Sequence, residues 1–250
     1  MVDQSVKTVL KVENLTKAFS ARDEIFEAVE NVSLEVHENE FLVILGPGQC
    51  GKTVLLNMIS GLEKPTSGEV KFSQAGSKIG FVFQKTAVFE WKTVMENVEF
   101  APMLRGVSKK ERREKAQYLI NLVGLTGFEN SYPNQLSGGM KQRVGIARAY
   151  AADPSILIMD EPFGALDAQT RYQMEEEVLR IWQKEKRSII FVTNNIEEAV
   201  YLADRIVLLS KCPAKVKAVY DVKLPKPRDY VDPEFLKIRE EIETQTDLPL

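Results

Sequence analysis

The sequence predicts a three-layer α/β protein in which buried strands alternate with helices. Short apolar runs rich in β-branched residues recur along the chain, and segments with the apolar period of helices separate them. Continuous runs of this kind are typical of parallel strands covered on both faces, so we expect a mostly parallel core sheet. The clearest runs are residues 41–45, 79–83, 156–159, 189–192 and 206–209.

The first part of the chain follows a different strand pattern. Residues 9–12 and 32–36 alternate between apolar and polar side chains, as half-exposed strands do. This alternation predicts an antiparallel β piece near the amino terminus. Turn residues punctuate the chain at 65–68 and 75–77.

Helices dominate the middle and the end of the chain. Beyond residue 93 the strand pattern stops and apolar residues recur at helical spacing, which predicts a helical subdomain inserted over residues 90–152. A later helix is expected over 169–186, with its apolar stripe in the core. We place the α/β domain at residues 1–222 and a tail at 223–250, with a polar helix over 234–244.

Composition and charge exclude several classes of site. The 250 residues include 33 basic and 36 acidic side chains, for a net charge of −3, so a chain-wide basic surface for nucleic acid is not expected. A basic run at 105–115 holds no aromatic residue, which favours a solvated helix face over a nucleic-acid or anionic-lipid site. Two cysteines and one histidine, His37, are too few for a disulfide framework or a multi-histidine metal centre, and they suit a reducing compartment.

No segment of the sequence is expected to cross a membrane. Residues 1–11 are mixed and polar, without the long apolar stretch of a secretory signal. The longest apolar runs, such as 41–45, span five residues, whereas a membrane helix needs about 20.

A glycine-rich loop follows the strand at 41–45. The run Gly46-Pro47-Gly48-Gln49-Cys50-Gly51-Lys52-Thr53 leads into a helical stretch that starts at Val54, which is the G-x-x-x-x-G-K-[ST] pattern in the context it requires. Glycines let backbone N–H groups turn toward phosphates, and the helix amino terminus adds its positive dipole end. We expect Lys52 to reach the β- and γ-phosphates of a nucleotide and Thr53 to coordinate Mg²⁺.

Another strand ends in two carboxylates. The apolar run at 156–159 is followed by Asp160 and Glu161, which in an open α/β sheet lie at the carboxyl end of the strand, beside the phosphate loop. Asp160 is expected to hold the metal through water. Glu161 is expected to polarise the attacking water as a general base.

A third motif precedes the helical stretch at 141–151. In the run Leu136-Ser137-Gly138-Gly139-Met140, Ser137 is a natural helix N-cap, and the two glycines allow a phosphate to approach closely. Together with the two nucleotide motifs, this run resembles the signature of the nucleotide-binding subunits of ABC transporters. The resemblance covers residues 9–222 and implies a P-loop NTPase fold.

The resemblance implies roles for further residues. Gln84 matches the residue that senses Mg²⁺ and the membrane partner, and Asp167 lies in a loop that crosses the dimer interface of the family. Phe19 matches the aromatic residue that stacks on adenine, with core packing as the alternative. In this family each ATP lies between the phosphate loop of one subunit and Ser137, Gly138 and Gly139 of the other, so a functional site requires a dimer.

Two runs are similar to the nitrate, sulfonate, taurine and bicarbonate importer branch, namely residues 84–94 and 161–171. This similarity implies an ATPase at the cytoplasmic face of the membrane that uses ATP and Mg²⁺. Its implied partners are a second ATPase subunit, membrane permease subunits and, indirectly, an external solute-binding protein, with no nucleic acid. The apolar side chains of Ala87, Val88, Phe89 and Trp91 suit a groove for a permease helix, although core packing also explains Phe89 and Trp91.

One position departs from the family pattern. A switch histidine normally follows the strand predicted here at 189–192, whereas this chain has Asn194. An asparagine amide donates a hydrogen bond to a γ-phosphate, but it carries no imidazolium charge and relays no proton. We therefore hypothesise that Asn194 slows hydrolysis, in both sites of a homodimer or in one site of a heterodimer. His37 is no substitute, because its polar turn predicts a surface role.

Two residues of the glycine-rich loop are also unusual. Gln49 stands where the family more often has glycine, so its backbone is expected to take a conformation that glycine prefers. Cys50 is either a reactive thiol that nucleotide protects or a buried, inert one.

Two other functions stay open. A non-transport ABC ATPase, in DNA maintenance, translation or cluster assembly, shares these motifs, although the sequence has neither the very long coiled coil of DNA-repair members nor the second motif set of translational members. An exporter or lipid-transport ATPase shares the same fold. The motifs do not identify the solute, because specificity in this family resides in the membrane and binding subunits.

Overall fold

The structure is a computed structural model that describes residues 7–21, 24–85 and 87–247. It comprises two compact units, one formed by residues 1–77 and 187–250 and the other by residues 78–186. The first six residues of the polar amino terminus and Thr86, in the run similar to importers, lie outside the described residues. The two units are described one after the other.

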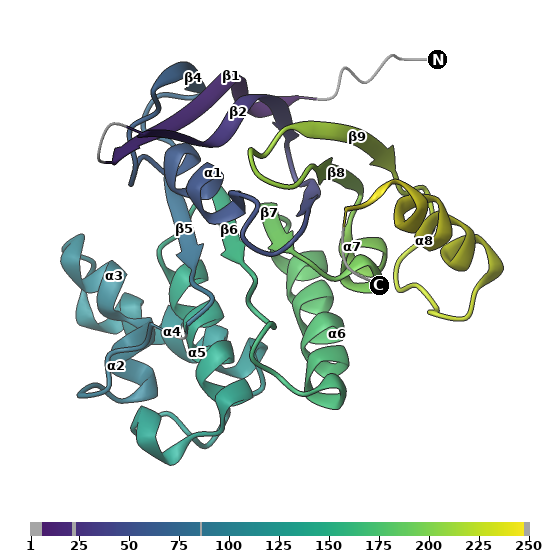
Figure 1. The fold of residues 1–250 in the computed structure, drawn as a ribbon. Coiled ribbons are helices and arrows are strands. Elements are labelled where there is room, and N and C mark those ends of the chain that lie inside the picture. The colour runs from purple at the N-terminus through teal and green to yellow at the C-terminus, as the bar shows by residue number, and fades with distance from the viewer. Residues whose placement is uncertain (1–6, 22–23, 86, 248–250) are drawn as a thin grey trace. The chain divides into compact units, whose positions relative to one another are not determined.

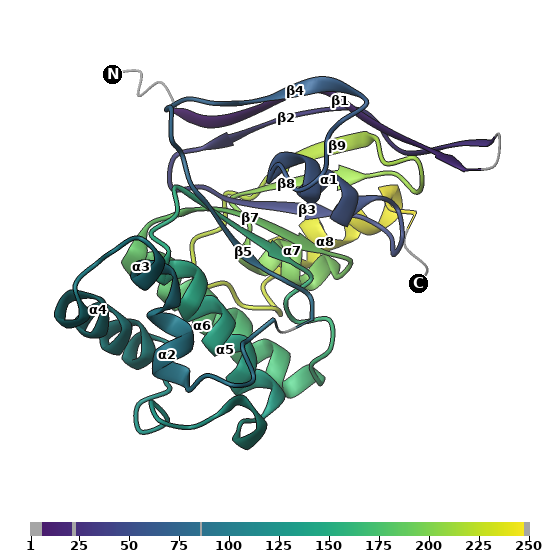
Figure 2. The ribbon, with the colours of Figure 1, turned by 90° about the vertical axis from the view of Figure 1, so that its left-hand side faces the viewer.

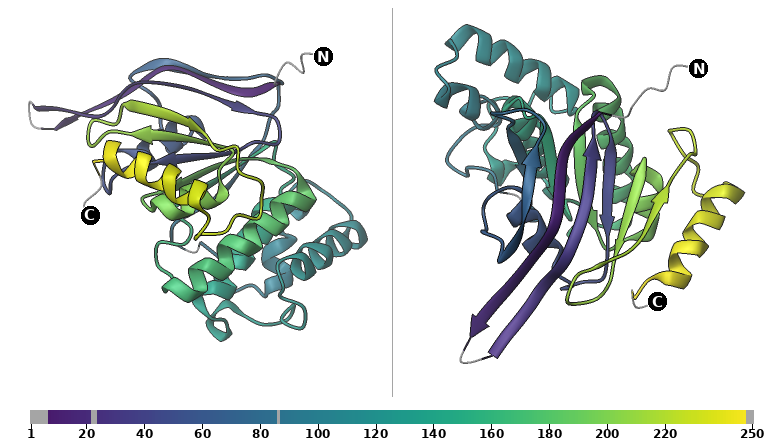
Figure 3. Two further views of the ribbon diagram at one scale, coloured as in Figure 1. Left: turned by 90° about the vertical axis from the view of Figure 1, so that its right-hand side faces the viewer. Right: turned by 90° about the horizontal axis from the view of Figure 1, so that it is seen from above.

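The first unit contains the expected antiparallel sheet. Strands β1 (Thr8–Ala21), β2 (Glu24–His37) and β4 (Ser67–Phe72) pair in the order β2-β1-β4 (Figure 1). The apolar side chains on one face of β1 and β2 are buried, and these two strands lie side by side well beyond the segments that alternation predicted (Figure 3). β4 starts inside the predicted turn, because pairing with β1 stabilises an edge strand of mostly exposed residues.

The same unit holds the strands that carry the phosphate loop. β3 (Phe41–Leu45) lies between β7 (Ser188–Thr193) and β8 (Arg205–Leu209), and both neighbours run parallel to it. The sequence predicted all three, and the side chains of β3 and β7 are completely enclosed. β9 (Val216–Asp221) pairs antiparallel with β8, and the pattern missed it because the strand has no buried residue and no continuous apolar run like those of β3, β7 and β8.

The described residues of the first unit also form three helices. α1 (Lys52–Ile59) follows β3 and lies under β2 (Figure 2). α7 (Ile196–Leu202) follows β7 and packs against β3. The predicted tail helix is α8 (Pro233–Gln245), which packs against α7.

The tail is tied to α7 by a buried guanidinium. Arg228 donates to the carbonyl oxygens of Val200 (2.5 Å) and Tyr201 (3.2 Å), two of the last carbonyls of α7 that have no partner within the helix. Burial lowers the pKa of Arg228 to about 10. The Tyr230 ring stacks on Tyr201, with 4.7 Å between the centroids. The tail is therefore a packed part of the first unit.

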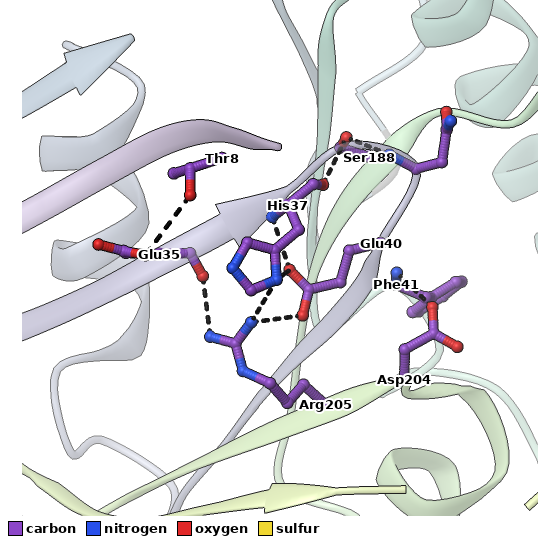
Figure 4. Close-up of polar contacts among 9 residues, drawn as sticks. Thr8, Glu35, His37, Glu40, Phe41, Ser188, Asp204 and Arg205 are labelled. Atoms are coloured by element: carbon purple, nitrogen blue, oxygen red, sulfur yellow. Dashed lines mark hydrogen bonds and ion pairs between the residues drawn. The ribbon is translucent and has the colours of Figure 1, made fainter. Parts of the chain in front are cut away.

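The single histidine belongs to a polar cluster at the amino-terminal ends of β3 and β8 (Figure 4). The guanidinium of Arg205 donates to Glu40 (2.6 Å) and to the carbonyl oxygen of Glu35 (2.9 Å), and it lies 3.1 Å from Nδ1 of His37. His37 is half-buried, with 26% of its side chain exposed, and it is bonded into this cluster rather than free at the surface as its polar turn suggested. The cluster fastens β2 to β3 and β8, at the end of the strands opposite the phosphate loop.

The second unit combines a pair of parallel strands with helices. β5 (Ile79–Val82) pairs in parallel with β6 (Ile156–Asp160), and the sequence predicted both as strands. Between them come α2 (Val94–Val98), α3 (Phe100–Leu104), α4 (Lys109–Leu122), the 3₁₀ turn η1 (Pro133–Gln135) and α5 (Gly138–Ala151). α6 (Ala168–Glu185) follows β6. The apolar stripe of α6 is buried as expected.

The helices at 94–104 are interrupted for a local reason. Pro102 has no N–H group to donate to the carbonyl of Val98, and its ring crowds that carbonyl. The chain therefore ends α2 at Val98 and starts α3 two residues later, where Pro102 falls in the first turn. Among the residues that the structure describes, no helix is both long and apolar enough to span a membrane.

Candidate ATP-binding site

The phosphate loop connects β3 to α1 in the first unit. Lys52 is buried, and its ammonium donates to the carbonyl oxygens of Gly46 (2.9 Å) and Pro47 (2.6 Å). The N–H of Gly46 donates in turn to the carbonyl oxygen of Thr193 on β7 (3.3 Å). The loop is thus anchored to the neighbouring strand and folded around the lysine that the sequence assigned to phosphate binding.

Two residues of the loop have left-handed backbones. Gly51 has φ 115°, and a Cβ at this position would lie 2.4 Å from the carbonyl oxygen of Ala28, so only glycine fits. Gln49 has φ 61°, which confirms the expectation that it adopts a conformation glycine prefers. Gly48 and Gln49 are exposed.

Cys50 lies under the loop. Its side chain is 1% exposed, and a Cβ at Gly46 would lie 3.1 Å from its Sγ. Burial raises the pKa of the Cys50 thiol, so the nucleophilic thiolate is disfavoured. Of the two alternatives for this residue, the structure supports the buried, inert thiol.

The first turn of α1 is suited to an anion. No side chain caps its amino terminus, and no acidic residue lies in the first turn. The helix dipole and the N–H groups at this end therefore favour a negatively charged ligand. Thr53, the expected Mg²⁺ ligand, is exposed on this turn, and Val54 follows it half-buried.

Asn194 lies beside the phosphate loop within the first unit. Thr193, the last residue of β7, pairs with Leu45, the last residue of β3, and Asn194 follows it directly. The side chain of Asn194 is exposed. The switch position and the phosphate loop therefore lie at the same end of two adjacent strands. The order of the residues in the sequence does not by itself require this proximity.

The second unit brings two of the predicted catalytic side chains together. β5 and β6 end side by side, and Nε2 of Gln84 donates to Oε2 of Glu161 (3.2 Å). Asp160, one residue earlier, is buried. Glu161 itself has φ 40°, a left-handed backbone that is rare for glutamate and costs about 1 kcal/mol or more. Backbone strain of this kind is common at active sites, where a side chain must be held in one orientation.

The signature run and Asp167 lie at the amino termini of two helices. Ser137 caps α5 by accepting from the N–H of Met140 (3.2 Å), and Asp167 caps α6 by accepting from the N–H and the hydroxyl of Thr170 (3.0 and 2.7 Å). These bonds lower the pKa of Asp167. A Cβ at Gly139 would lie 3.2 Å from Thr170, so the two caps are neighbours. Ser137 and Gly138 are exposed.

The expected metal ligands fit Mg²⁺ by their chemistry. Thr53, Gln84 and Asp160 offer a hydroxyl, an amide and a carboxylate oxygen, which are hard ligands of the kind that Mg²⁺ takes. Among the described residues, no group of three or more His, Cys, Asp or Glu side chains is arranged to hold a metal ion.

Phe19 lies on β1, where it pairs with Phe26 on β2. Its side chain is 37% exposed, and the ammonium of Lys17 lies 4.9 Å from the ring centroid. This exposure speaks against the core-packing alternative for Phe19.

The segment after Gln84 presents an exposed aromatic side chain. Trp91 is 73% exposed, whereas Phe89 is half-buried and packs on Phe100, with 4.6 Å between the centroids. The guanidinium of Arg148 lies 5.1 Å from the centroid of Phe89. Core packing therefore accounts in part for Phe89 but not for Trp91.

Sequence reasoning missed two buried polar residues that support these segments. Asn97 makes four side-chain hydrogen bonds to the backbone between Phe89 and Thr93. Glu198 accepts a hydrogen bond from Thr193, next to Asn194. The sequence does carry one signal here: an asparagine followed three residues later by a glutamate is a helix-capping pattern, and Asn195 and Glu198 mark the start of α7 in this way. The contact between Glu198 and Thr193 depends on the fold and has no such signal.

Comparison with known proteins supports the motif assignments. The family model described as ABC transporter matches residues 29–164. An aliphatic sulfonates import ATP-binding protein from Bacillus cereus is 40% identical over 238 residues, covering 93% of this chain and 94% of the relative. The chain belongs to the ABC transporter family. A nitrate import ATP-binding protein from a Synechocystis species is 41% identical to this ABC subunit over 247 residues, covering 93% of both chains.

A solved structure of the family supports the fold and the activity. It is a dimeric ATP-binding cassette in a post-hydrolysis state with ADP and Pi, with a TM-score of 0.74 and 34% identity, and the match covers 86% of this chain and 100% of that one. This ABC subunit is accordingly an ATPase of importer type. The family also accounts for the α/β fold with its mostly parallel strands and separate antiparallel sheet.

Proposed function

We propose that this ABC subunit powers the import of a small anionic solute through a separate membrane permease, at whose cytoplasmic face it binds. The relatives named for sulfonate and nitrate import support an anionic solute. The observation that carries the coupling is within the second unit. Gln84 contacts Glu161, and the same segment continues to Trp91, which is exposed on a loop that Asn97 holds in place.

The ATP site is assigned residue by residue. The backbone of the phosphate loop and Lys52 bind the β- and γ-phosphates, and Glu161 activates the attacking water. Phe19 stacks on adenine. Thr53, Gln84 and Asp160, the last through water, hold Mg²⁺, which neutralises charge that develops on the phosphates. A second ATPase subunit supplies Ser137, Gly138, Gly139 and Asp167 to each site, which agrees with the exposure of Ser137 and Gly138.

Asn194 limits the rate of hydrolysis in this proposal. Its position beside the loop allows an amide hydrogen bond to the γ-phosphate but no proton relay. Loss of one positioned group of this kind typically costs about 10² to 10³ in rate. Steady-state ATPase of the assembled transporter should therefore rise on Asn194→His, because the exposed position admits the larger ring. An unchanged turnover number would show that this position does not limit catalysis.

Transport with alanine variants tests the coupling surface. Trp91→Ala should lower solute uptake into proteoliposomes at least tenfold while the Kd for ATP stays unchanged, because Trp91 touches the permease and not the nucleotide. Phe128→Ala is the matched control, since Phe128 is an exposed aromatic residue elsewhere in the second unit. Full uptake by Trp91→Ala would contradict this surface. Co-purification with ribosomes or nucleic acid, rather than with a membrane protein, would favour the non-transport alternative.

A further inference from the structure

A ring of hydrogen bonds surrounds the backbone at Asn194. The hydroxyl of Thr193 donates to Oε2 of Glu198 (2.5 Å) and accepts from the N–H of Asn195 (3.0 Å). Oδ1 of Asn195 accepts from the N–H of Glu198 (3.1 Å), which closes the ring. Thr193 and Glu198 are 2% and 4% exposed, so the ring lies inside the first unit.

The ring joins the phosphate loop to the first turn of α7. The carbonyl oxygen of Thr193 accepts from the N–H of Gly46, and its hydroxyl is bound within the ring. The residues directly before and after Asn194 are thus both hydrogen-bonded within the ring, whereas the side chain of Asn194 is exposed. We expect a change that loosens the ring to move the amide of Asn194 relative to the loop.

Helix capping does not explain the carboxylate in this ring. In a capping box the carboxylate at this position accepts from the backbone N–H of the N-cap residue, but the N–H of Asn195 donates to the hydroxyl of Thr193 instead (3.0 Å), so the carboxylate of Glu198 does not act as a cap. Burying a carboxylate is costly, and an apolar side chain of similar volume is often as stable or more so. What the carboxylate adds is an acceptor that orients the hydroxyl of Thr193, and through it the backbone before Asn194.

We infer that Glu198 is a positioning residue for ATP hydrolysis, which acts by holding Asn194 at the rim of the phosphate loop. This inference rests on the role proposed above for Asn194. Glu198 touches no substrate, so its removal should affect the chemical step rather than nucleotide binding, which Lys52 and the loop backbone provide.

Single variants give the first test, with the purified full-length chain. Glu198→Ala and the nearly isosteric Thr193→Val should each lower kcat about tenfold to a hundredfold, since small displacements of a reacting group have effects of this size. The Kd for ATP from calorimetry should change less than twofold. Glu198→Gln should recover most of the rate, because its amide oxygen still accepts from Thr193. Glu197→Gln is the control, since Glu197 pairs with Arg239 on α8 (3.2 Å).

A double-variant cycle separates positioning from a general loss of structure. If Glu198 acts through Asn194, then Glu198→Ala should cause no further loss of kcat in the Asn194→Ala background. Suppose that Asn194→Ala lowers kcat and that adding Glu198→Ala lowers it a further tenfold. This result would overturn the inference about Glu198 and leave the role of Asn194 intact. Normal kcat of Asn194→Ala alone would overturn both. Thr193→Val keeps the test decisive if Glu198→Ala does not fold.

Discussion

Replacement of Asn97 by alanine is a stringent test of how the loop at residues 89–93, which carries Trp91, is held in place. Asn97 is fully buried just beyond this loop. Its Oδ1 accepts from the N–H of Phe89 (2.8 Å), and its Nδ2 donates to the carbonyl oxygens of Phe89, Lys92 and Thr93 (3.1, 3.0 and 3.0 Å). One side chain therefore holds the loop that carries Trp91.

The expected loss of stability depends on which backbone groups keep another hydrogen bond when the side chain of Asn97 is removed. The carbonyl of Phe89 still accepts from the N–H of Lys92, and the carbonyl of Thr93 from the backbone N–H of residue 97. Among the contacts of the described residues, the N–H of Phe89 and the carbonyl of Lys92 have only the side chain of Asn97. Two unsatisfied groups at about 1.5 kcal/mol each predict a loss of about 3 kcal/mol in the free energy of unfolding.

Urea unfolding measures this loss directly. The midpoint should fall for Asn97→Ala, whereas Asn121→Ala, at an exposed position, should cost less than about 0.5 kcal/mol. The fluorescence anisotropy of Trp91 should also fall, because the freed loop moves faster, in a background where Trp182→Phe removes the other tryptophan. A loss below about 1 kcal/mol, or unchanged anisotropy, would refute the argument that Asn97 holds this loop.

Three further outcomes are expected. Gln49→Gly should raise the free energy of unfolding by about 0.5 to 1 kcal/mol, because it relieves the left-handed backbone; a lower value in urea unfolding would contradict this. Iodoacetamide should label Cys212, which is half-buried, at least tenfold faster than Cys50 by mass spectrometry, and fast labelling of Cys50 that ATP prevents would restore the reactive alternative. Hydrogen bonds from Lys71 and Lys11 lower the pKa of Glu13 to about 2, so its contribution to stability is present above pH 4.5 and is lost as the pH falls toward 2. Glu13→Gln should flatten this acid limb of the unfolding midpoint, and an unchanged limb would exclude the contribution.

Local patterns were sufficient for the main strands and for the motifs. A buried strand, a glycine-rich loop and a helix in succession place Lys52 and Thr53 at a helix amino terminus, whatever else the chain does. The same holds for the cap Ser137, because a capping side chain bonds to its own helix. The absent histidine was equally plain, since the printed residue at position 194 is asparagine.

Contacts between distant residues decided the rest. β4 and β9 escaped the pattern because edge strands with exposed faces depend on their partners and not on their own apolar residues. The cluster around His37 joins residues more than 160 positions apart, which no local pattern reports.

The sequence by itself determined that this chain binds and hydrolyses nucleotide, because that chemistry needs particular residue types at short, fixed spacing. Only the tertiary structure decided how those residues are held. The buried polar side chains of Asn97 and Glu198 look ordinary in the sequence, and they acquire their roles from the groups that burial brings within hydrogen-bond distance. Burial excludes water, so each such group must find its partner within the fold, and the fold then fixes Trp91 and Asn194.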